Sequence, residues 1–581
     1  MIVQAEYLSI TAEAVAQPAA LLEAENMEYQ LLCYTRKPDE TMYYGPRLAY
    51  SMHIALREGD GKYIPLNHNS GVLFARATEN ADGSLNPKSL KKPYIVRLAD
   101  GSFEIHALRI EGDGQAEENE TELCFKSADL VVYEEMSECD CTCTAQKPDE
   151  AGEAFDEALI SGIAGCVPGN VISITEKEAQ YLKNKLMTPE IVRLEVQDSV
   201  QVSGAEDIGN IQATAYYSDG TSLTRSVDWN VGEIDFTKKN IAQKITGTVK
   251  QKRFAFPLLI NRADPCITSW NGKYYFIATN DADNNHTIYI READSIEGLE
   301  SAEDVLLLDS STYEDIGNLL WAPEFHEING RLYIFHAATP GEFFSEESHI
   351  MMLKDGGNPC NKDDWSRPRK IVKMDGSALC EAGKTISLDM TCFHWMGEYY
   401  VVWSQRQFLP KDLGAWLYIA KLNQERPWEL ASEPVLLSKP DYGWDNNHTF
   451  VDEGPFALVS GDKLFVTFSG AAVDESYVVS YLELINNDSL LDRNSWRKNN
   501  YPILSARSVD GEYGTGHNAY VIDEDGIVWN TYHARPGADG PRSTGIRRVH
   551  FDVDGCPMLD VTEDRDMTDE LRKVETTIVL A

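Results

Sequence analysis

One hairpin pattern recurs five times in the second half of the chain and constrains the fold more than any other feature. Each copy has a short apolar strand headed by a polar or acidic residue, a turn that contains glycine, and a second strand rich in aromatic residues. The copies follow one another at intervals of roughly 55–70 residues, which suits a few short strands per unit. Repeats of this kind are typical of β-propellers. The sequence therefore predicts an all-β protein with a five-bladed β-propeller, whose copies begin near Arg262, Trp321, Leu388, Glu453 and Gly516.

The charge balance excludes two classes of partner. The chain has 581 residues, with 52 Lys and Arg against 93 Asp and Glu, and a formal net charge of −41. Nucleic acids and anionic membrane surfaces attract basic patches, so neither is an expected partner. No stretch approaches the roughly 20 apolar residues that a membrane-spanning helix needs. A neutral, polyhydroxylated partner fits this composition better.

The N-terminus and the cysteines predict a cytoplasmic, bacterial protein. The first residues show no basic region followed by an apolar core, so we expect no signal peptide. The cysteine count of 11 is odd and most are scattered, which favours reduced thiols. Only Cys139, Cys141 and Cys143 are clustered. Their spacing is not the C-x-x-C of zinc sites and no histidine lies nearby, so the pattern does not favour a metal site there.

The length predicts several domains. Strand patterns over 1–143 indicate a β-rich module, in which a further hairpin has Lys92 where an acid would stand and so resembles a decayed propeller blade; an unrelated β-sandwich is the alternative. Residues 144–187 are expected to be a linker with short helices, because Thr175 and Glu178 form a capping-box pattern. Short strands around one tryptophan over 188–252 resemble bacterial immunoglobulin-like domains. The propeller is expected over 253–560, and a short tail over 561–581.

Three acids stand at the heads of separate repeats, namely Asp264, Asp389 and Glu453. The inner strands of a propeller converge on its axis, so residues at their starts face one shared pocket. Carboxylates gathered in one cavity shift one another's pKa values, which is how a site obtains an acid and a base near neutral pH. A single Asp at such a position is more often a turn or cap residue. Three at equivalent positions favour catalysis, and hydrolysis of a glycosidic bond requires such a pair.

Five motifs make the resemblance to a known family specific. Arg-Ala-Asp-Pro, Trp-Ala-Pro-Glu, Ser-Leu-Asp-x-Thr-x-Phe, Asp-Glu-Gly-Pro and Tyr-Gly-x-Gly-His-Asn occur in this order over about 254–560. The chain resembles glycoside hydrolase family 43, and most of all its α-L-arabinofuranosidases. That resemblance implies an inverting mechanism, with Asp264 as the general base, Glu453 as the general acid, and Asp389 raising the pKa of the acid and holding it in position.

The resemblance also implies residues that bind the substrate and a metal. Trp321 would offer an aromatic face to a sugar ring, Gln405 would contact a hydroxyl, and Arg547, with Arg548 as the alternative register, would meet the sugar and the acid. His517 resembles a family histidine near a structural calcium ion at the propeller centre, and no organic cofactor is expected. The implied substrates are oligosaccharides of plant cell-wall arabinan or arabinoxylan.

Two other functions remain open at this point. One is a β-xylosidase of the same family, because the two sugars present similar hydroxyl patterns. The other is a non-catalytic, carbohydrate-binding propeller, although all three acids are present. The oligomeric state is not predicted.

Overall fold

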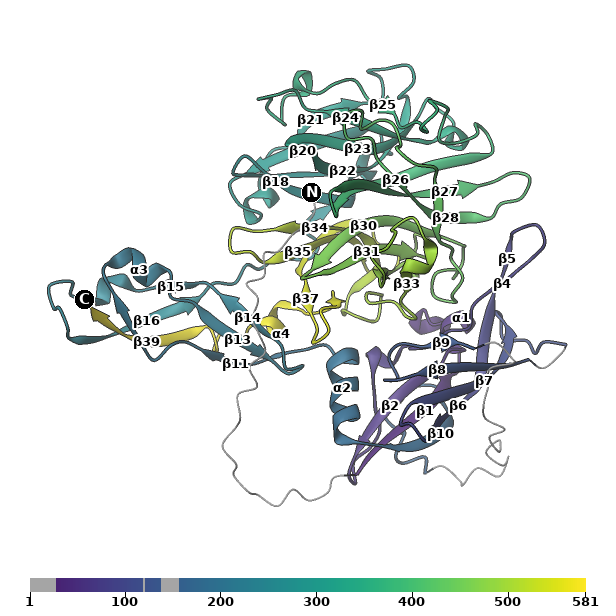
Figure 1. Ribbon diagram of the computed structural model, residues 1–581, viewed down its shortest axis with the longest axis horizontal. Coiled ribbons are helices and arrows are strands. Elements are labelled where there is room, and N and C mark those ends of the chain that lie inside the picture. Colours follow the sequence, from purple (N-terminus) through teal and green to yellow (C-terminus); the bar gives the residue numbers. More distant parts are fainter. Residues whose placement is uncertain (1–27, 119–120, 137–155) are drawn as a thin grey trace.

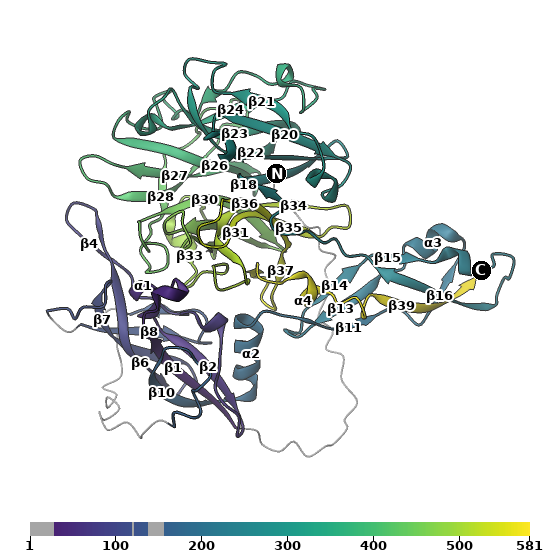
Figure 2. The ribbon, with the colours of Figure 1, turned by 180° about the vertical axis from the view of Figure 1, so that it is seen from behind.

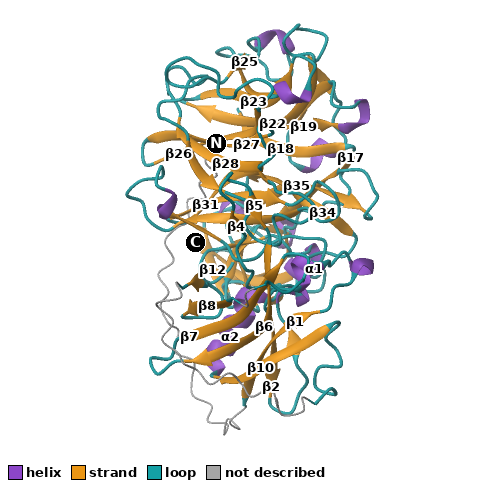
Figure 3. Ribbon diagram, turned by 90° about the vertical axis from the view of Figure 1, so that its right-hand side faces the viewer, coloured by secondary structure: helices purple, strands orange, loops and turns teal. Residues whose placement is uncertain are grey.

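The computed structural model describes residues 28–118, 121–136 and 156–581. Strands dominate this part of the chain, as the sequence predicts, and the all-β class is confirmed (Figure 3). Within the described residues no helix is long and apolar enough to cross a membrane. The α-helices of this part are α1 (Pro46–Ala49), α2 (Glu176–Leu186), α3 (Ala205–Gly209) and α4 (Glu563–Asp566).

Residues 259–548, all of them described, form five antiparallel sheets of four strands each. The inner strand of each sheet contacts the inner strand of the next, and that of the last sheet contacts that of the first, so the sheets form a closed ring. These sheets make up the upper part of the molecule in Figure 1. The expected hairpins are the first two strands of these sheets. At the junction, Leu259 and Ile260 pair with Thr544 and Ser543 of the last sheet.

The strands of the ring run in chain order. They are β17 (Leu259–Ile260), β18 (Arg262–Trp270), β19 (Lys273–Asn280), β20 (Thr287–Ala293), β21 (Val305–Asp309), β22 (Asn318–Ile328), β23 (Arg331–Thr339), β24 (Glu347–Met352), β25 (Arg369–Lys370), β26 (Thr385–Trp395), β27 (Glu398–Gln407), β28 (Gly414–Lys421), β29 (Val435–Ser438), β30 (Asp452–Ser460), β31 (Lys463–Gly470), β32 (Val478–Leu484), β33 (Trp496–Lys498), β34 (Glu512–Ile522), β35 (Val528–Pro536) and β36 (Ser543–Arg548).

The same backbone irregularity interrupts the first strand of every sheet in the ring. Pairing with the second strand shifts at a bulge in each of β18, β22, β26, β30 and β34. One residue at each bulge has a positive φ between 44° and 54°, and these residues are Asp264, Ala322, Asp389, Gly454 and His517. A bulge bends its strand and re-aims a side chain. At these equivalent positions, the side chains of the five inner strands therefore point in directions that a regular strand would not give them.

The N-terminal unit consists of two packed four-stranded sheets, in which β6 contacts β1 and β10. One sheet contains β10 (Cys166–Ile174), β1 (Tyr29–Arg36), β2 (His53–Glu58) and β3 (Ile64–Pro65). The other contains β6 (Lys88–Arg97), β7 (Phe103–Glu111), β8 (Glu122–Ser127) and β9 (Glu134–Glu135), and β4 (Thr78–Glu79) pairs separately with β5 (Leu85–Asn86). Lys92 lies at a bulge of β6 and has a φ of 52°, like the bulge residues of the ring. However, Lys92 is exposed, and its sheet is not one of the five sheets of the ring.

The segment expected to be a linker belongs to this unit. Strand β10 pairs along the whole of β1, so the unit continues beyond residue 143. Helix α2 has the predicted capping box of Thr175 and Glu178. Its buried residues Ala179, Leu182 and Leu186 join the core of the unit. The apolar face of the helix would be exposed in a free linker, which is the physical reason that it packs here.

Two smaller sheets form a third unit around a shared core that contains Trp229. One contains β11 (Ile191–Glu195), β13 (Ala213–Tyr217) and β14 (Ser222–Arg225); the other contains β12 (Ser199–Val202), β39 (Lys573–Leu580), β16 (Ala242–Val249) and β15 (Val227–Trp229). The expected C-terminal tail thus contains β39, which pairs with β12 on one side and with β16 on the other. Figure 2 shows β39 beside β16. Its alternating burial, with Thr576, Ile578 and Leu580 inside, explains the placement.

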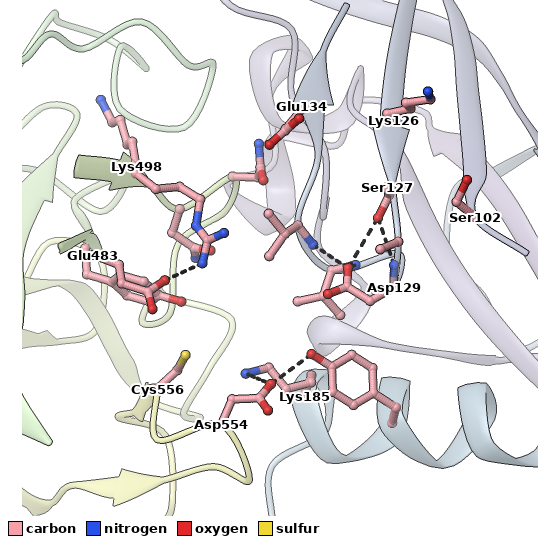
Figure 4. A pocket seen from close by; sticks show the side chains of 18 of the residues that line it. Ser102, Lys126, Ser127, Asp129, Glu134, Lys185, Glu483, Lys498, Asp554 and Cys556 are labelled. Atoms are coloured by element: carbon pink, nitrogen blue, oxygen red, sulfur yellow. Dashed lines mark hydrogen bonds and ion pairs between the residues drawn. The ribbon is translucent and has the colours of Figure 1, made fainter. Parts of the chain in front are cut away.

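A polar cavity separates parts of the N-terminal unit from the ring (Figure 4). Its volume is about 780 Å³, and it is lined by Lys126 and Asp129 on one side and by Glu483 and Lys498 on the other. Acidic and basic groups alternate on its walls, and several are paired, as Arg497 is with Glu483. Because groups of both signs line this cavity, its charge favours neither an anionic nor a cationic ligand.

Candidate active site

A second cavity, of about 300 Å³, collects residues from the first strands of all five sheets of the ring. The three predicted catalytic acids lie in its wall together, so the structure brings them to one place. The remaining lining residues are mainly apolar or basic, and they are Trp321, Phe343, Ile386, Leu388, Arg406, Ala415, Val473, His517 and Arg542. Apolar walls with a few convergent polar groups are characteristic of ligand sites.

Asp264 is a buried carboxylate surrounded by cationic or polar nitrogens. Its Oδ1 atom lies 3.0 Å from His533 Nδ1, 3.3 Å from His517 Nδ1 and 3.3 Å from the Arg542 guanidinium. Burial alone would raise the pKa of Asp264, but the charge of Arg542, together with the ring nitrogens of His517 and His533, outweighs it and holds the pKa well below its usual range. Asp264 is therefore ionised at neutral pH and can accept a proton.

Glu453 has the opposite electrostatic environment. Burial, together with the negative charge of Asp264, raises the pKa of Glu453 to about 7, although Tyr477 opposes the shift. The Tyr477 hydroxyl donates a hydrogen bond of 2.7 Å to Glu453 Oε1. A carboxyl group with a pKa near 7 retains its proton in part at neutral pH and can donate it. The two acids thus differ in the way that acid–base catalysis requires.

Asp389 contacts the backbone beside Glu453. Its Oδ2 atom accepts a hydrogen bond of 3.1 Å from the backbone N–H of Gly454, the residue that follows Glu453. Burial and repulsion from Glu453 and Asp264 raise the pKa of Asp389 well above its usual range. Gly454 has φ +54°, and a Cβ there would lie 3.0 Å from His517 Nδ1. A side chain at this position would have a strained backbone and would crowd His517, which explains the glycine.

The arginine that contacts Asp264 in the cavity is not the one that the sequence suggested. Arg547 binds Glu512 behind the cavity, and Arg548 binds Asp566, so neither lines it. Arg542 lines it instead and contacts both Asp264 and Asp281. It immediately precedes β36, whose first residue is Ser543. The sequence could have indicated Arg542 by its position at the start of a strand, because the predicted acids also lie near the starts of their strands.

Two aromatic residues and a second arginine complete the wall. Trp321 lines the cavity as predicted and its indole donates a 2.8 Å hydrogen bond to Asn285. Phe343, which the sequence did not reveal, contacts the Trp321 ring edge to face. Gln405 does not line the cavity, whereas its neighbour Arg406 does. Consecutive residues of a strand point to opposite faces, which explains the difference.

His517 has one ring nitrogen that is still available to a ligand. Burial lowers the pKa of His517 to about 4, so the ring is neutral. Nδ1 lies beside Asp264, whereas Nε2 is buried and has no hydrogen-bond partner among the described residues. A neutral imidazole with its Nδ1 proton toward a carboxylate presents the Nε2 lone pair. His517 could therefore bind a metal ion through Nε2. It lies in no cluster of metal-ligating residues in the described chain, so the remaining ligands of such an ion would be waters.

Comparison with known proteins identifies relatives of the ring. A sequence model described as glycosyl hydrolases family 43 matches residues 255–557. An extracellular exo-α-(1→5)-L-arabinofuranosidase of Streptomyces chartreusis is 31% identical over 48% of this chain and 81% of its own, and one of Streptomyces avermitilis is 30% identical over 52% and 62%. The solved α-L-arabinofuranosidase of Lactobacillus brevis is 30% identical over 52% of this chain and 95% of its own, with a TM-score of 0.46.

These relatives correct the expected location and cover only part of the chain. Both Streptomyces proteins are named extracellular, which contradicts the cytoplasmic location expected from the N-terminus and the cysteines. The chain spans only about 62% of the length of the Streptomyces avermitilis relative. The matched part contains the ring and its cavity, and the two other units lie almost entirely outside it.

Proposed function

The chain belongs to glycosyl hydrolases family 43, and on that premise we propose that it removes terminal α-L-arabinofuranosyl residues from arabinan- or arabinoxylan-derived saccharides. The observation that carries the proposal is the divergence of two acids in one cavity. Asp264 is held ionised, whereas Glu453 has a pKa of about 7. The Streptomyces relatives are named exo-acting arabinofuranosidases, which supports this sugar and a terminal cleavage.

The proposed mechanism is inverting. Glu453 donates its proton to the leaving glycosidic oxygen, while Asp264 removes a proton from a water that attacks the anomeric carbon from the opposite face. Arg542 keeps Asp264 charged before the reaction. Asp389 contacts the backbone beside Glu453 and so fixes the position of the acid. After turnover Asp264 holds a proton and Glu453 has lost one, and exchange with solvent restores both.

The ring of sheets is interpreted as a five-bladed propeller, and the small unit around Trp229 as an immunoglobulin-like sandwich. The closed contacts among the five inner strands support the first, and the two packed sheets support the second. Calcium is proposed at the axis, with His517 Nε2 as its protein ligand. A bound calcium ion would supply positive charge near the acids, which would favour their ionised forms.

The proposal is tested by hydrolysis of p-nitrophenyl α-L-arabinofuranoside and p-nitrophenyl β-xyloside in parallel. We expect turnover of the arabinoside and its loss in Glu453→Gln, which keeps the shape of the side chain but cannot protonate the leaving group. An arabino-oligosaccharide, followed by NMR, should release arabinose whose anomeric configuration is inverted. Turnover of the xyloside alone would refute the sugar assignment. Binding without hydrolysis of any of these saccharides would refute catalysis.

A further inference from the structure

A second group of chemically reactive side chains lies in the N-terminal unit, outside the ring. Glu104 and His106 are two residues apart on β7, and Cys124 lies directly opposite His106 on β8. Alternate residues of a strand share a face, so all three lie on one face of the sheet. The other face carries Phe103, Ile105 and Ala107, which belong to the hydrophobic core. The three polar residues are nevertheless buried, with exposed fractions of 1%, 3% and 4%.

The potential ligand atoms of this group converge. One carboxylate oxygen of Glu104, one ring nitrogen of His106 and the sulfur of Cys124 all lie within 4.8 Å of one another. Glu104 Oε2 is 3.5 Å from His106 Nε2, which is too long for a good hydrogen bond. Two ligands of a tetrahedral zinc ion, at about 2.0–2.1 Å from the metal, are about 3.3 Å apart. The observed spacing is close to that value.

His106 Nε2 is the atom that needs a partner. It is buried and makes no hydrogen bond to any described residue. Such an atom is costly unless it is paired or coordinated. It lies 3.5 Å from a carboxylate oxygen of Glu104, and a ring nitrogen of His106 is within 4.8 Å of the Cys124 sulfur, so a cation bound among the three would satisfy it.

The other side of the imidazole is oriented as in known metal sites. His106 Nδ1 lies 3.4 Å from Glu122 Oε1, and the Tyr94 hydroxyl donates a 3.1 Å hydrogen bond to the same carboxylate. The Tyr94 ring also stacks on the imidazole at 4.9 Å. A carboxylate on the second nitrogen fixes the tautomer and leaves the first nitrogen free to coordinate a metal.

We propose that Glu104, His106 and Cys124 bind one zinc ion. A set of one nitrogen, one oxygen and one sulfur suits a borderline metal better than calcium or magnesium, which do not favour a thiolate ligand. The three side chains leave a fourth coordination position. The ion ties β7 to β8 on the face of the sheet that has no hydrophobic core and so stabilises the pairing of these two strands.

The test uses the full chain and zinc or cobalt alone. Cys139, Cys141 and Cys143, which lie outside the described residues, are replaced by serine in the background protein so that their thiols cannot contribute. Isothermal titration with zinc chloride should give one equivalent. Cobalt(II) should give a thiolate charge-transfer band, and both signals should disappear in Cys124→Ser and His106→Gln.

Two further variants separate binding from folding. Glu122 has a half-exposed side chain, so Glu122→Gln should fold normally and weaken zinc about 10–100-fold through loss of the orienting carboxylate. Cys166→Ser is the matched control, because that thiol is half-buried in the same unit and lies in no ligand group of the described chain. It should bind as the background does. Circular dichroism checks that each variant is folded.

Three results would overturn the proposal. The first is no stoichiometric zinc in the unsubstituted chain. The second is that the serine background has already lost the site. The third is that folded Cys124→Ser or His106→Gln binds zinc and cobalt as the background does.

Discussion

The hydrogen bond from Tyr477 to Glu453 sets the upper pH limit of the proposed activity, and Tyr477→Phe tests that role. The hydroxyl donates a 2.7 Å hydrogen bond to Glu453 Oε1 and stabilises the ionised carboxylate. It therefore lowers the pKa of Glu453, which burial raises, and the net value is about 7. The replacement removes only one oxygen. The ring, which stacks on His533 at 5.5 Å, stays in place.

The size of the effect follows from the bond that is lost. A hydrogen bond to a charged group contributes about 1.5–3 kcal/mol, and a bond to the neutral acid contributes about 1 kcal/mol. The difference is about 0.5–2 kcal/mol, and since about 1.4 kcal/mol corresponds to one pKa unit, the pKa of Glu453 should rise by about one unit in the variant. The general acid must be protonated to act, so the basic limb of the kcat/KM profile should move upward by about one pH unit.

The assay is the pH dependence of kcat/KM for p-nitrophenyl α-L-arabinofuranoside. Tyr520→Phe is the matched control, because its hydroxyl donates a 3.0 Å hydrogen bond to Thr467 and does not line the cavity. It should leave both limbs unchanged. A basic limb that stays in place or moves down in Tyr477→Phe would refute the assignment of Glu453 as the acid under the control of this hydroxyl.

Three further predictions concern the arginine, a buried ion pair and the last strand. Arg542→Lys cannot bridge Asp264 and Asp281 with a planar fork, so kcat/KM should fall about 10²-fold, as expected for the loss of about 2–3 kcal/mol of charged hydrogen bonding; unchanged kinetics would exclude Arg542 from the site. Lys185→Met leaves the carboxylate of Asp552 buried and unpaired, so urea unfolding should show a loss of about 3–5 kcal/mol; a loss below about 1 kcal/mol would show that the pair is exposed in solution. Deletion of residues 573–581 removes the strand between β12 and β16, so limited proteolysis should cut residues 191–249 faster; an unchanged rate would contradict the pairing.

The sequence predicts the local parts of this structure well. The five hairpins are contiguous, with alternating apolar residues and a turn between them, so their strands are encoded within about 20 residues each. The three acids also have a local signal, because each lies near the start of an inner strand and the structure places all three in one cavity. The capping box of α2 is local too, and it was predicted.

The features that the sequence did not predict depend on distant partners. The pairing of β10 with β1 joins segments more than 120 residues apart, and that of β39 with β16 joins segments more than 300 apart. The local sequence of either strand does not indicate which distant strand it pairs with. Arg542 was missed for a related reason: whether an arginine near a strand start or one five residues later faces the cavity depends on the exact register of β36 against β35. No pattern within a single strand determines that register.

The bulges explain why the three acids are not interchangeable. Asp264 and Asp389 themselves occupy the left-handed position, which aspartate tolerates better than most residues because its short side chain bonds locally. In β30 the left-handed residue is Gly454, and the acid is the longer Glu453 immediately before it. That shift allows the Gly454 N–H to bind Asp389 while the Glu453 side chain reaches Tyr477. The repeated bulge therefore places the proposed base and the proposed acid in different environments. Their opposite pKa shifts follow from those environments.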